Sequence, residues 1–325
     1  MITLKDIATE CGVSVSTVSR ALNGPDLIRP ELAAEIRETA LRMGYQPNEV
    51  ARSLKMNRTG MIGILHDVGI HHPFFSEMLE AIRCSAEKRG FDTLLLSRIQ
   101  RNNSSDSSDL ALSRRMDGII VIYADVKDSG LDRLLRNRIP VVSVDDCNRP
   151  CPVIASDYEN GTRRLVEEAF RKGRRRIAFI HGEMGPSTSR RIDGFLAAIA
   201  AHGLCGELIP SAFQDGKGSA ELLLSRLRQP DPPDCFLLPD DTSAVHTLLR
   251  LREEGLQAPG NVGIAGFDGQ RWACGMMPEL TTFRQNLEQI GEEALDILIS
   301  GMNGGEKSSR GEILVPGELI SGKTL

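Results

Sequence analysis

Residues 12–23 carry a row of polar side chains whose chemistry suits contact with a nucleic acid. The row comprises Ser16, Thr17, Ser19 and Arg20. Short hydroxyls donate hydrogen bonds to phosphate oxygens, and a guanidinium can form two hydrogen bonds with the edge of a guanine. The same pattern fits a solvated helix in a small helical bundle. From this stretch alone the two interpretations are equally open.

The residues around this row predict the helices that position it. Thr3 and Asp6 have the capping-box spacing, in which the two side chains satisfy free N–H groups at a helix start. Gly12 ends this first helix, because glycine accepts a left-handed backbone without a side-chain clash. Ser14 can then cap a second helix. The apolar stripe of the second helix comprises Val15, Val18 and Leu22. The polar row lies off that stripe.

Two further helical segments follow. Residues 30–43 predict a third helix that begins with proline, whose missing N–H costs nothing in a first turn. Three helices in under fifty residues have the size of a helix-turn-helix module. Residues 49–56 then allow only one or two helical turns, too few to be stable alone. We expect this segment to fold only against a second copy of itself or against DNA.

Composition narrows the class of protein. The chain has 325 residues, of which 41% are apolar and 26% charged, as is ordinary for a globular protein of two or three domains. Residues 1–58 hold eight Lys and Arg residues against seven Asp and Glu residues, a net charge of +1 that leaves −6 for the rest of a chain whose total is −5. A weakly cationic head on an acidic body permits contact with DNA.

The sequence shows no pattern of membrane insertion or export. No apolar run approaches the roughly 20 residues that a transmembrane helix needs, and the first residues lack the pattern of a signal peptide. The seven cysteines are odd in number and dispersed, so we expect free thiols rather than disulfides or a zinc site. We therefore predict a cytoplasmic protein that uses no cofactor and no metal.

From residue 61 onward, short apolar segments alternate with helical ones. Strands are expected at residues 61–65, 93–96, 118–122, 141–144, 177–180, 235–238 and 262–265. Helices are expected at residues 74–89, 159–172, 187–202, 217–229 and 241–255. Apolar strands that alternate with helices indicate parallel sheets covered on both faces. We expect two doubly wound units with a ligand-binding crevice between the strand ends.

The whole chain resembles the LacI/GalR (lactose-repressor) family of bacterial transcription regulators. In the head, the resemblance rests on residues 3–8 and 12–23, and it continues at residues 44–48 and 51–54. In the body it rests on Pro73-Phe74-Phe75, Asp117-Gly118-Ile119, Arg191-Ile192-Asp193-Gly194-Phe195, Gly266-Phe267-Asp268 and Leu280-Thr281-Thr282. The implied fold is an all-α helix-turn-helix headpiece joined to an α/β body like the periplasmic binding proteins, with two doubly wound parallel-sheet subdomains.

The resemblance also implies how the chain is divided. Residues 1–47 correspond to the DNA-binding headpiece, residues 48–58 to a hinge helix and linker, and residues 61–325 to an effector-binding and dimerisation domain. In that domain, the N-subdomain covers about residues 61–154 and 285–311, and the C-subdomain about residues 155–284 and 312–325. The chain would thus cross three times between the subdomains.

For DNA binding, the resemblance implies that the second helix enters the major groove and that two hinge helices meet in the minor groove. Val15 and Ser16 stand at positions that set operator preference, and Arg20 stands at a base-contacting position. Leu54 matches a leucine that wedges between base pairs, and its alternative role is an apolar anchor against the body. The expected DNA contacts are Thr3, Ser14, Val15, Ser16, Thr17, Ser19, Arg20, Asn23, Ala51, Leu54 and Lys55.

For effector binding, the resemblance implies a sugar-type site between the subdomains. Charged side chains would bond vicinal hydroxyls, and aromatic faces would stack on C–H surfaces. The expected residues are Phe74, Phe75, Arg191, Phe213, Asp241, Asp268 and Trp272. For Trp272, the only tryptophan, packing in the core is an open alternative. The histidines at positions 66, 71 and 72 fit satisfied or exposed side chains better than metal ligands.

These features favour a transcription regulator that is not an enzyme. We expect a homodimeric repressor of carbohydrate-metabolism genes that binds a palindromic operator and responds to a sugar-like effector. The alternatives are a cytoplasmic sugar-binding protein without a regulatory role and a co-repressed or activating member of the family. A solute-binding transport protein does not explain the head. A sugar-converting enzyme is disfavoured because the sequence has no nucleophile elbow, phosphate-binding loop or H-E-x-x-H motif.

Overall fold

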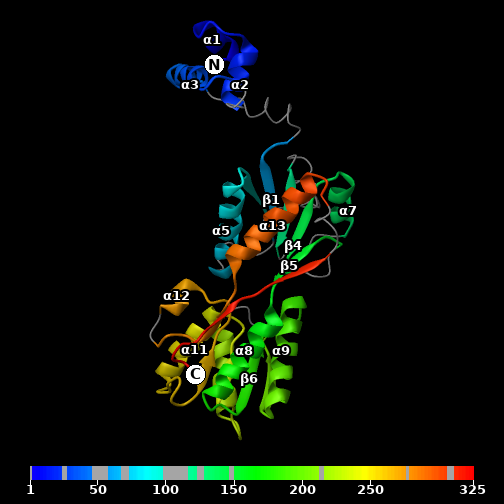
Figure 1. Cartoon of the computed structure of the whole chain (residues 1–325). Coiled ribbons are helices and arrows are strands. Elements are labelled where there is room, and N and C mark those ends of the chain that lie inside the picture. Colours follow the sequence, from blue (N-terminus) through cyan, green and yellow to red (C-terminus); the bar gives the residue numbers. More distant parts are fainter. Residues whose placement is uncertain are drawn as a thin grey trace. The chain divides into compact units, whose positions relative to one another are not determined.

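The protein divides into two compact units, Met1–Thr59 and Gly60–Leu325, and each is described by itself. The computed structural model describes residues 2–23, 28–45, 58–66, 73–97, 116–122, 128–145, 150–211, 216–275, 278–305 and 311–325 (Figure 1). Within these ranges, no helix combines the length and the apolar character that crossing a membrane requires. The six cysteines in these ranges are free thiols, as expected.

The first unit contains the three expected helices, α1 (Leu4–Glu10), α2 (Val15–Asn23) and α3 (Pro30–Arg42). Its local signals are confirmed. The backbone N–H and the hydroxyl of Thr3 both donate to Oδ2 of Asp6, at 2.8 Å each. Gly12 has a φ of +62°, and the backbone N–H of Thr17 donates to the Ser14 hydroxyl at 3.1 Å. Capping chemistry therefore sets the turn between α1 and α2.

A small apolar core joins the three helices of this unit. Ile7 of α1, Val18 and Ala21 of α2 and Ile36 of α3 are fully buried in it. Val15, which was expected on the apolar stripe of α2, is instead exposed, because the first turn of α2 lies outside this core. The stripe therefore begins one turn later than the sequence spacing suggested.

The second unit contains a six-stranded parallel sheet in the order β11-β5-β4-β3-β1-β2. Its strands are β1 (Met61–His66), β2 (Asp92–Ser97), β3 (Gly118–Ile122), β4 (Val141–Val144), β5 (Val153–Ser156) and β11 (Glu312–Val315). Helices α5 (Pro73–Lys88) and α13 (Leu287–Met302) pack on one face, and α7 (Asp128–Arg136) packs on the other. Alternate strand residues point into the two resulting cores, as a buried parallel sheet requires.

One expected subdomain boundary is displaced. β11 was assigned to the C-subdomain, but it pairs in parallel with β5, from Glu312 opposite Val153 to Val315 opposite Ser156. It therefore forms the edge of the N-subdomain sheet, and the last crossing of the chain follows residue 315 rather than residue 311. The pairing joins segments more than 150 residues apart, which local patterning does not reveal.

The second parallel sheet has four strands in the order β7-β6-β8-β9. They are β6 (Arg176–His181), β7 (Cys205–Pro210), β8 (Cys235–Leu237) and β9 (Gly263–Ala265). One face is covered by α8 (Tyr158–Arg171) and α9 (Pro186–His202), and the other by α10 (Gly216–Leu227) and α11 (Asp241–Glu253). The short α12 (Arg271–Cys274) follows β9. The alternation expected from the sequence is therefore present in both sheets.

The crossing segments form a small sheet of their own. β10 (Thr282–Arg284) pairs antiparallel with β12 (Glu318–Ile320). Beyond β12, the buried Thr324 hydroxyl donates to the Ile264 carbonyl at 2.6 Å and accepts from the Thr281 backbone N–H at 3.0 Å. The last described residues thus help to close the second sheet.

Two helix pairs in this unit pack with their backbones in close contact. A Cβ atom on Gly194 of α9 would overlap the backbone carbonyl oxygen of Glu159 in α8. A Cβ atom on Gly291 of α13 would lie 2.9 Å from the carbonyl oxygen of Ala81 in α5. Glycine at these two positions therefore sets the distance between neighbouring helices.

Candidate functional site

The first candidate surface is the outer face of α2. Val15, Ser16 and Arg20 are exposed there, as a helix that contacts a partner through these residues requires. Thr17 and Ser19 are half-buried. The surface combines an apolar side chain, hydroxyls and one guanidinium, which are groups that read base edges and phosphates.

The hydroxyls at the start of α2 form a connected group. Ser14 Oγ lies 2.7 Å from Ser16 Oγ and 2.8 Å from Thr17 Oγ1. Since Ser14 also caps the helix, its hydroxyl has a structural role that is independent of any DNA contact. Thr3 is exposed as well, and its hydroxyl donates to Asp6.

Some expected site residues lie outside the residues that the structure describes. They are Ala51, Leu54 and Lys55 of the expected hinge, Phe213 of the expected effector site, and the side chain of Asn23. Their roles remain predictions.

The second candidate site lies where β8 and β9 end. Asp240 follows β8 and caps α11, accepting from the Ser243 backbone N–H at 2.6 Å and from the Ser243 hydroxyl at 3.1 Å. Asp268 follows β9 and is buried. The charges of Asp240 and Asp241 both act on Asp268, so the three carboxylates form one cluster at the carboxyl ends of the strands. This is the edge at which parallel α/β sheets bind ligands.

Asp241 has a different place from the one we expected. It is fully buried, and both of its carboxylate oxygens accept hydrogen bonds from the protein. The Thr282 hydroxyl donates to Oδ1 at 2.6 Å, and the Gln270 backbone N–H donates to Oδ2 at 2.7 Å. Asp241 therefore fixes the loop that follows Asp268 through hydrogen bonds that occupy both of its carboxylate oxygens. The expected role of direct ligand contact fits Asp268 and the half-buried Asp240 better.

Asp268 is held in a conformation that side chains rarely adopt. Its φ is +108°, and its backbone N–H donates to the Phe283 carbonyl at 2.9 Å. The Gln285 side-chain amide donates to Asp268 Oδ1 at 2.8 Å, and the Ser156 hydroxyl hydrogen-bonds to Gln285 Oε1. This chain of contacts joins Ser156, at the end of β5 in the first sheet, to Asp268, which follows β9 of the second sheet. Sequence reasoning missed Gln285, although it lies three residues after Thr282, where a segment that carried the family resemblance ends.

Burial raises the pKa values of two carboxyl groups of the cluster. Burial, opposed by the hydrogen bonds from Thr282 and Gln270, raises the pKa of Asp241 to about 7. Burial and the charges of Asp241 and Asp240 raise the pKa of Asp268 well above its ordinary value, against the opposing effect of Arg191. The two carboxyl groups therefore favour uptake of a proton or of a ligand that donates hydrogen bonds.

Arg191 supplies the cation beside these carboxylates. Its Nη1 donates to the Pro239 carbonyl at 2.7 Å, and its Cζ lies 3.9 Å from the centre of the Phe267 ring. The stacking on Phe267 and the bond to Pro239 orient the planar guanidinium. Of the expected effector residues, the structure therefore brings Arg191, Asp241 and Asp268 together.

The remaining aromatic residues have other surroundings. Phe74 and Phe75, in the first turn of α5, are both buried in the core of the N-subdomain, and the Phe75 ring lies 5.0 Å from that of His66. Their packing accounts for both residues without a ligand. Trp272 on α12 is 42% exposed, so the alternative of core packing is wrong for it. A role for Trp272 as a wall of the effector site remains a prediction.

Comparisons with known proteins agree with this architecture. Residues 3–48 match the model of the bacterial regulatory proteins of the lacI family, and residues 166–325 match the periplasmic binding protein-like domain. The HTH-type transcriptional repressor PurR of Edwardsiella ictaluri is 30% identical over 313 residues, which cover 92% of this chain and 90% of that protein.

Solved structures show the same fold. The lac repressor dimer bound to operator and the anti-inducer ONPF superposes with a TM-score of 0.82 at 22% identity, covering 99% of this chain and 98% of the other. The complex of the transcriptional regulator CelR with cellobiose gives a TM-score of 0.71 at 22% identity, covering 100% of both chains. The fold class expected from the sequence is confirmed.

Proposed function

Because this chain belongs to the lacI family of bacterial regulatory proteins, we propose that it is a repressor whose hold on its operator is controlled by a small polyhydroxylated effector. It is a DNA-binding transcription regulator and not an enzyme. The proposal concerns the effector, the operator and the residues that bind them. We further propose that it acts in the cytoplasm as a homodimer on a palindromic site.

The proposed effector class rests on the group formed by the buried Asp268 and Gln285 and the half-buried Arg191. A carboxylate and an amide accept and donate hydrogen bonds beside an oriented guanidinium, and this set suits the vicinal hydroxyls of a sugar. The Arg191 guanidinium lies over the buried rings of Phe267 and Phe179, which helps to orient it toward a ligand. The solved CelR complex contains cellobiose, which supports a sugar as the effector in this fold.

The proposed DNA contacts rest on the exposed face of α2. Val15, Ser16 and Arg20 would enter the major groove, with Thr17 and Ser19 beside the phosphates. Residues 48–58 would form the hinge helix and linker, and Leu54 of that helix would wedge between base pairs of the minor groove. Such a wedge bends the DNA, and a change in the body that separated two hinge helices would release it.

The proposal is tested by gel shift with the full chain and DNA from the promoter region of its own gene. We expect a specific shift that competitor DNA does not remove, and we expect one member of a panel of neutral sugars to weaken it. Strengthening by a sugar would make the effector a co-repressor. The absence of a specific shift, or indifference to every sugar in the presence of a working operator, would count against the corresponding half of the proposal.

Arg20→Ala is expected to weaken operator binding by about 1–3 kcal/mol, or roughly 5- to 150-fold, because a base-contacting guanidinium is lost. Arg42→Ala is the control, since Arg42 of α3 is also exposed and is paired with Glu10 at 3.3 Å. Fluorescence anisotropy on the identified operator measures both variants. Equal losses in the two variants would mean that Arg20 acts through general charge rather than through base contact.

Asp268→Asn is expected to weaken effector binding by about 1.5–3 kcal/mol, or roughly 10- to 150-fold, because charge-assisted hydrogen bonds are lost. Asparagine tolerates a positive φ, so the backbone is spared. Asp231→Asn is the control, because Asp231 also has a positive φ, of +48°, but lies exposed between α10 and β8. Titration calorimetry with the active sugar measures both. Unchanged affinity in Asp268→Asn would remove Asp268 from the site.

A further inference from the structure

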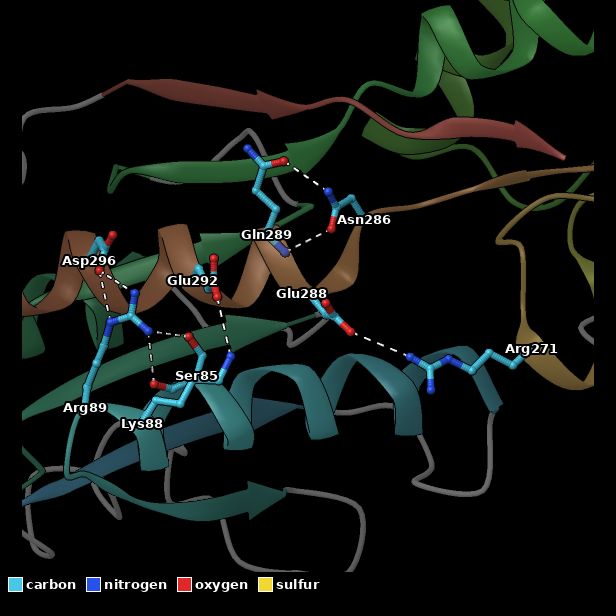
Figure 2. A network of polar contacts seen from close by, with 9 residues as sticks. All are labelled: Ser85, Lys88, Arg89, Arg271, Asn286, Glu288, Gln289, Glu292 and Asp296. Carbon is cyan, nitrogen blue, oxygen red and sulfur yellow. Dashed lines mark hydrogen bonds and ion pairs between the residues drawn. The ribbon is translucent and has the colours of Figure 1, made fainter.

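Within the described ranges, two ion pairs join the elements of one sheet to those of the other. In the first, Arg271 of α12 lies 3.6 Å from Glu288 of α13 (Figure 2). In the second, Nη2 of Arg190 in α9 lies 2.6 Å from Oε1 and 2.8 Å from Oε2 of Glu312 in β11. Both pairs therefore span the two subdomains, and they differ in how much solvent reaches them.

Solvent exposure separates the two pairs. The side chains of Arg271 and Glu288 are 86% and 81% exposed, so water and salt screen their attraction. The side chains of Arg190 and Glu312 are 25% and 32% exposed, and one nitrogen is close to both carboxylate oxygens. The Arg190–Glu312 pair is therefore the stronger link between the subdomains.

The position of Arg190 connects this link to the effector site. Arg190 directly precedes Arg191, and consecutive side chains on an α-helix point about 100° apart. Arg191 points to Pro239 and Phe267 inside the C-subdomain, whereas Arg190 reaches Glu312 on the edge of the other sheet. A rotation or shift of α9 that moves Arg191 toward a ligand must also move Arg190 relative to Glu312.

We propose that the Arg190–Glu312 pair is a latch that holds the two subdomains in the arrangement of this structure. Effector binding would have to overcome this latch. The regulatory consequence rests on the proposed function, because it assumes that Arg191 contacts the effector. The latch itself does not rest on the proposed function, since the ion pair would hold the subdomains together whether or not the chain binds an effector. It sets how much of the effector's binding energy is needed to change the subdomain arrangement.

The fluorescence of Trp272 can be used to test the latch. It is the only tryptophan of the chain, it is 42% exposed, and its neighbour Arg271 reaches α13 of the other subdomain. Because Arg271 next to it spans the two subdomains, we expect a change in their arrangement to alter the surroundings of the indole. The experiment measures the emission maximum and acrylamide quenching of the full chain, without DNA or sugar, for the wild type, Arg190→Gln and Glu312→Gln.

The control is Arg226→Gln. Arg226 of α10 pairs with Glu207 of β7 at 2.9 Å within one subdomain, and the two side chains are 19% and 39% exposed.

We expect a red shift and stronger quenching in Arg190→Gln and Glu312→Gln, wild-type behaviour in Arg226→Gln, and recovery in the charge-swapped double variant Arg190→Glu/Glu312→Arg. Wild-type fluorescence in both single variants, an equal shift in Arg226→Gln, or no recovery on charge swapping would overturn the latch. A wild-type chain that shifts no DNA would count against the proposed function and leave this comparison intact.

Discussion

Replacing Gly194 by alanine is expected to lower the free energy of unfolding by roughly 3 kcal/mol, the upper range for overpacking a core. The added Cβ would overlap the carbonyl oxygen of Glu159, which belongs to the backbone of α8 and cannot rotate away. Helices α8 and α9 would have to separate, and Phe195 beside Gly194 would lose packing in the shared core. The effect is therefore structural and large.

Urea unfolding followed by circular dichroism measures this loss. Gly182→Ala is the matched control, because a Cβ there meets nothing within 4 Å and its φ lies outside the left-handed region. The control is expected to stay within about 0.5 kcal/mol of the wild type. A Gly194→Ala variant as stable as Gly182→Ala would show that α8 and α9 are farther apart than the structure places them.

Raising the pH from about 4 to about 7 is expected to weaken the wild-type chain relative to Asp241→Asn, by an amount on the order of 4 kcal/mol. Burial raises the pKa of Asp241 to about 7, from an ordinary value of 3.8. Between these values the folded chain binds a proton that the unfolded chain has released. The contribution of protonated Asp241 to the free energy of unfolding is therefore fully present below pH 4 and is lost as the pH rises through 7.

Asparagine preserves the contacts of this side chain while removing the titration. Its amide oxygen can accept from the Gln270 backbone N–H, and its amide nitrogen can donate to the Thr282 hydroxyl. Urea unfolding of wild type and variant at several pH values gives the difference. The comparison between the two chains is needed because the lowered pKa values of Glu168 and Glu80 oppose the trend in each. A difference that is independent of pH would mean that Asp241 is not a buried titrating group.

Local patterns were sufficient to predict the headpiece and the alternation of strands and helices. The capping pair Thr3 and Asp6, the turn at Gly12 and the cap at Ser14 act within a few residues, so their spacing determines the structure. The seven expected strands are similarly read from their own residues, whereas the buried strand β5 (Val153–Ser156) was not predicted. Val15 was misplaced on the apolar stripe because the extent of a small core depends on how three helices meet.

The site was harder to predict because it depends on contacts between distant segments. Asp240 and Asp241 are adjacent, and only the turn from β8 into α11 decides that Asp240 caps the helix while Asp241 is buried behind the cluster. Gln285 reaches Asp268 and Ser156 only after β10 is in place. The pairing of β11 with β5 is likewise invisible to any local pattern.

The late pairing of residues 312–325 has a consequence for synthesis on the ribosome. β11 completes the edge of the first sheet, and Thr324 adds a hydrogen bond to Ile264 of the second, so both sheets gain their last contacts from the same short segment. Residues 1–59 form a separate compact unit and can fold as soon as they emerge. A nascent chain halted before residue 312 would therefore carry a folded headpiece on a body whose first sheet lacks the edge strand β11 and whose second sheet lacks the contact of Thr324. In such a chain the means of contacting DNA would precede the means of controlling it.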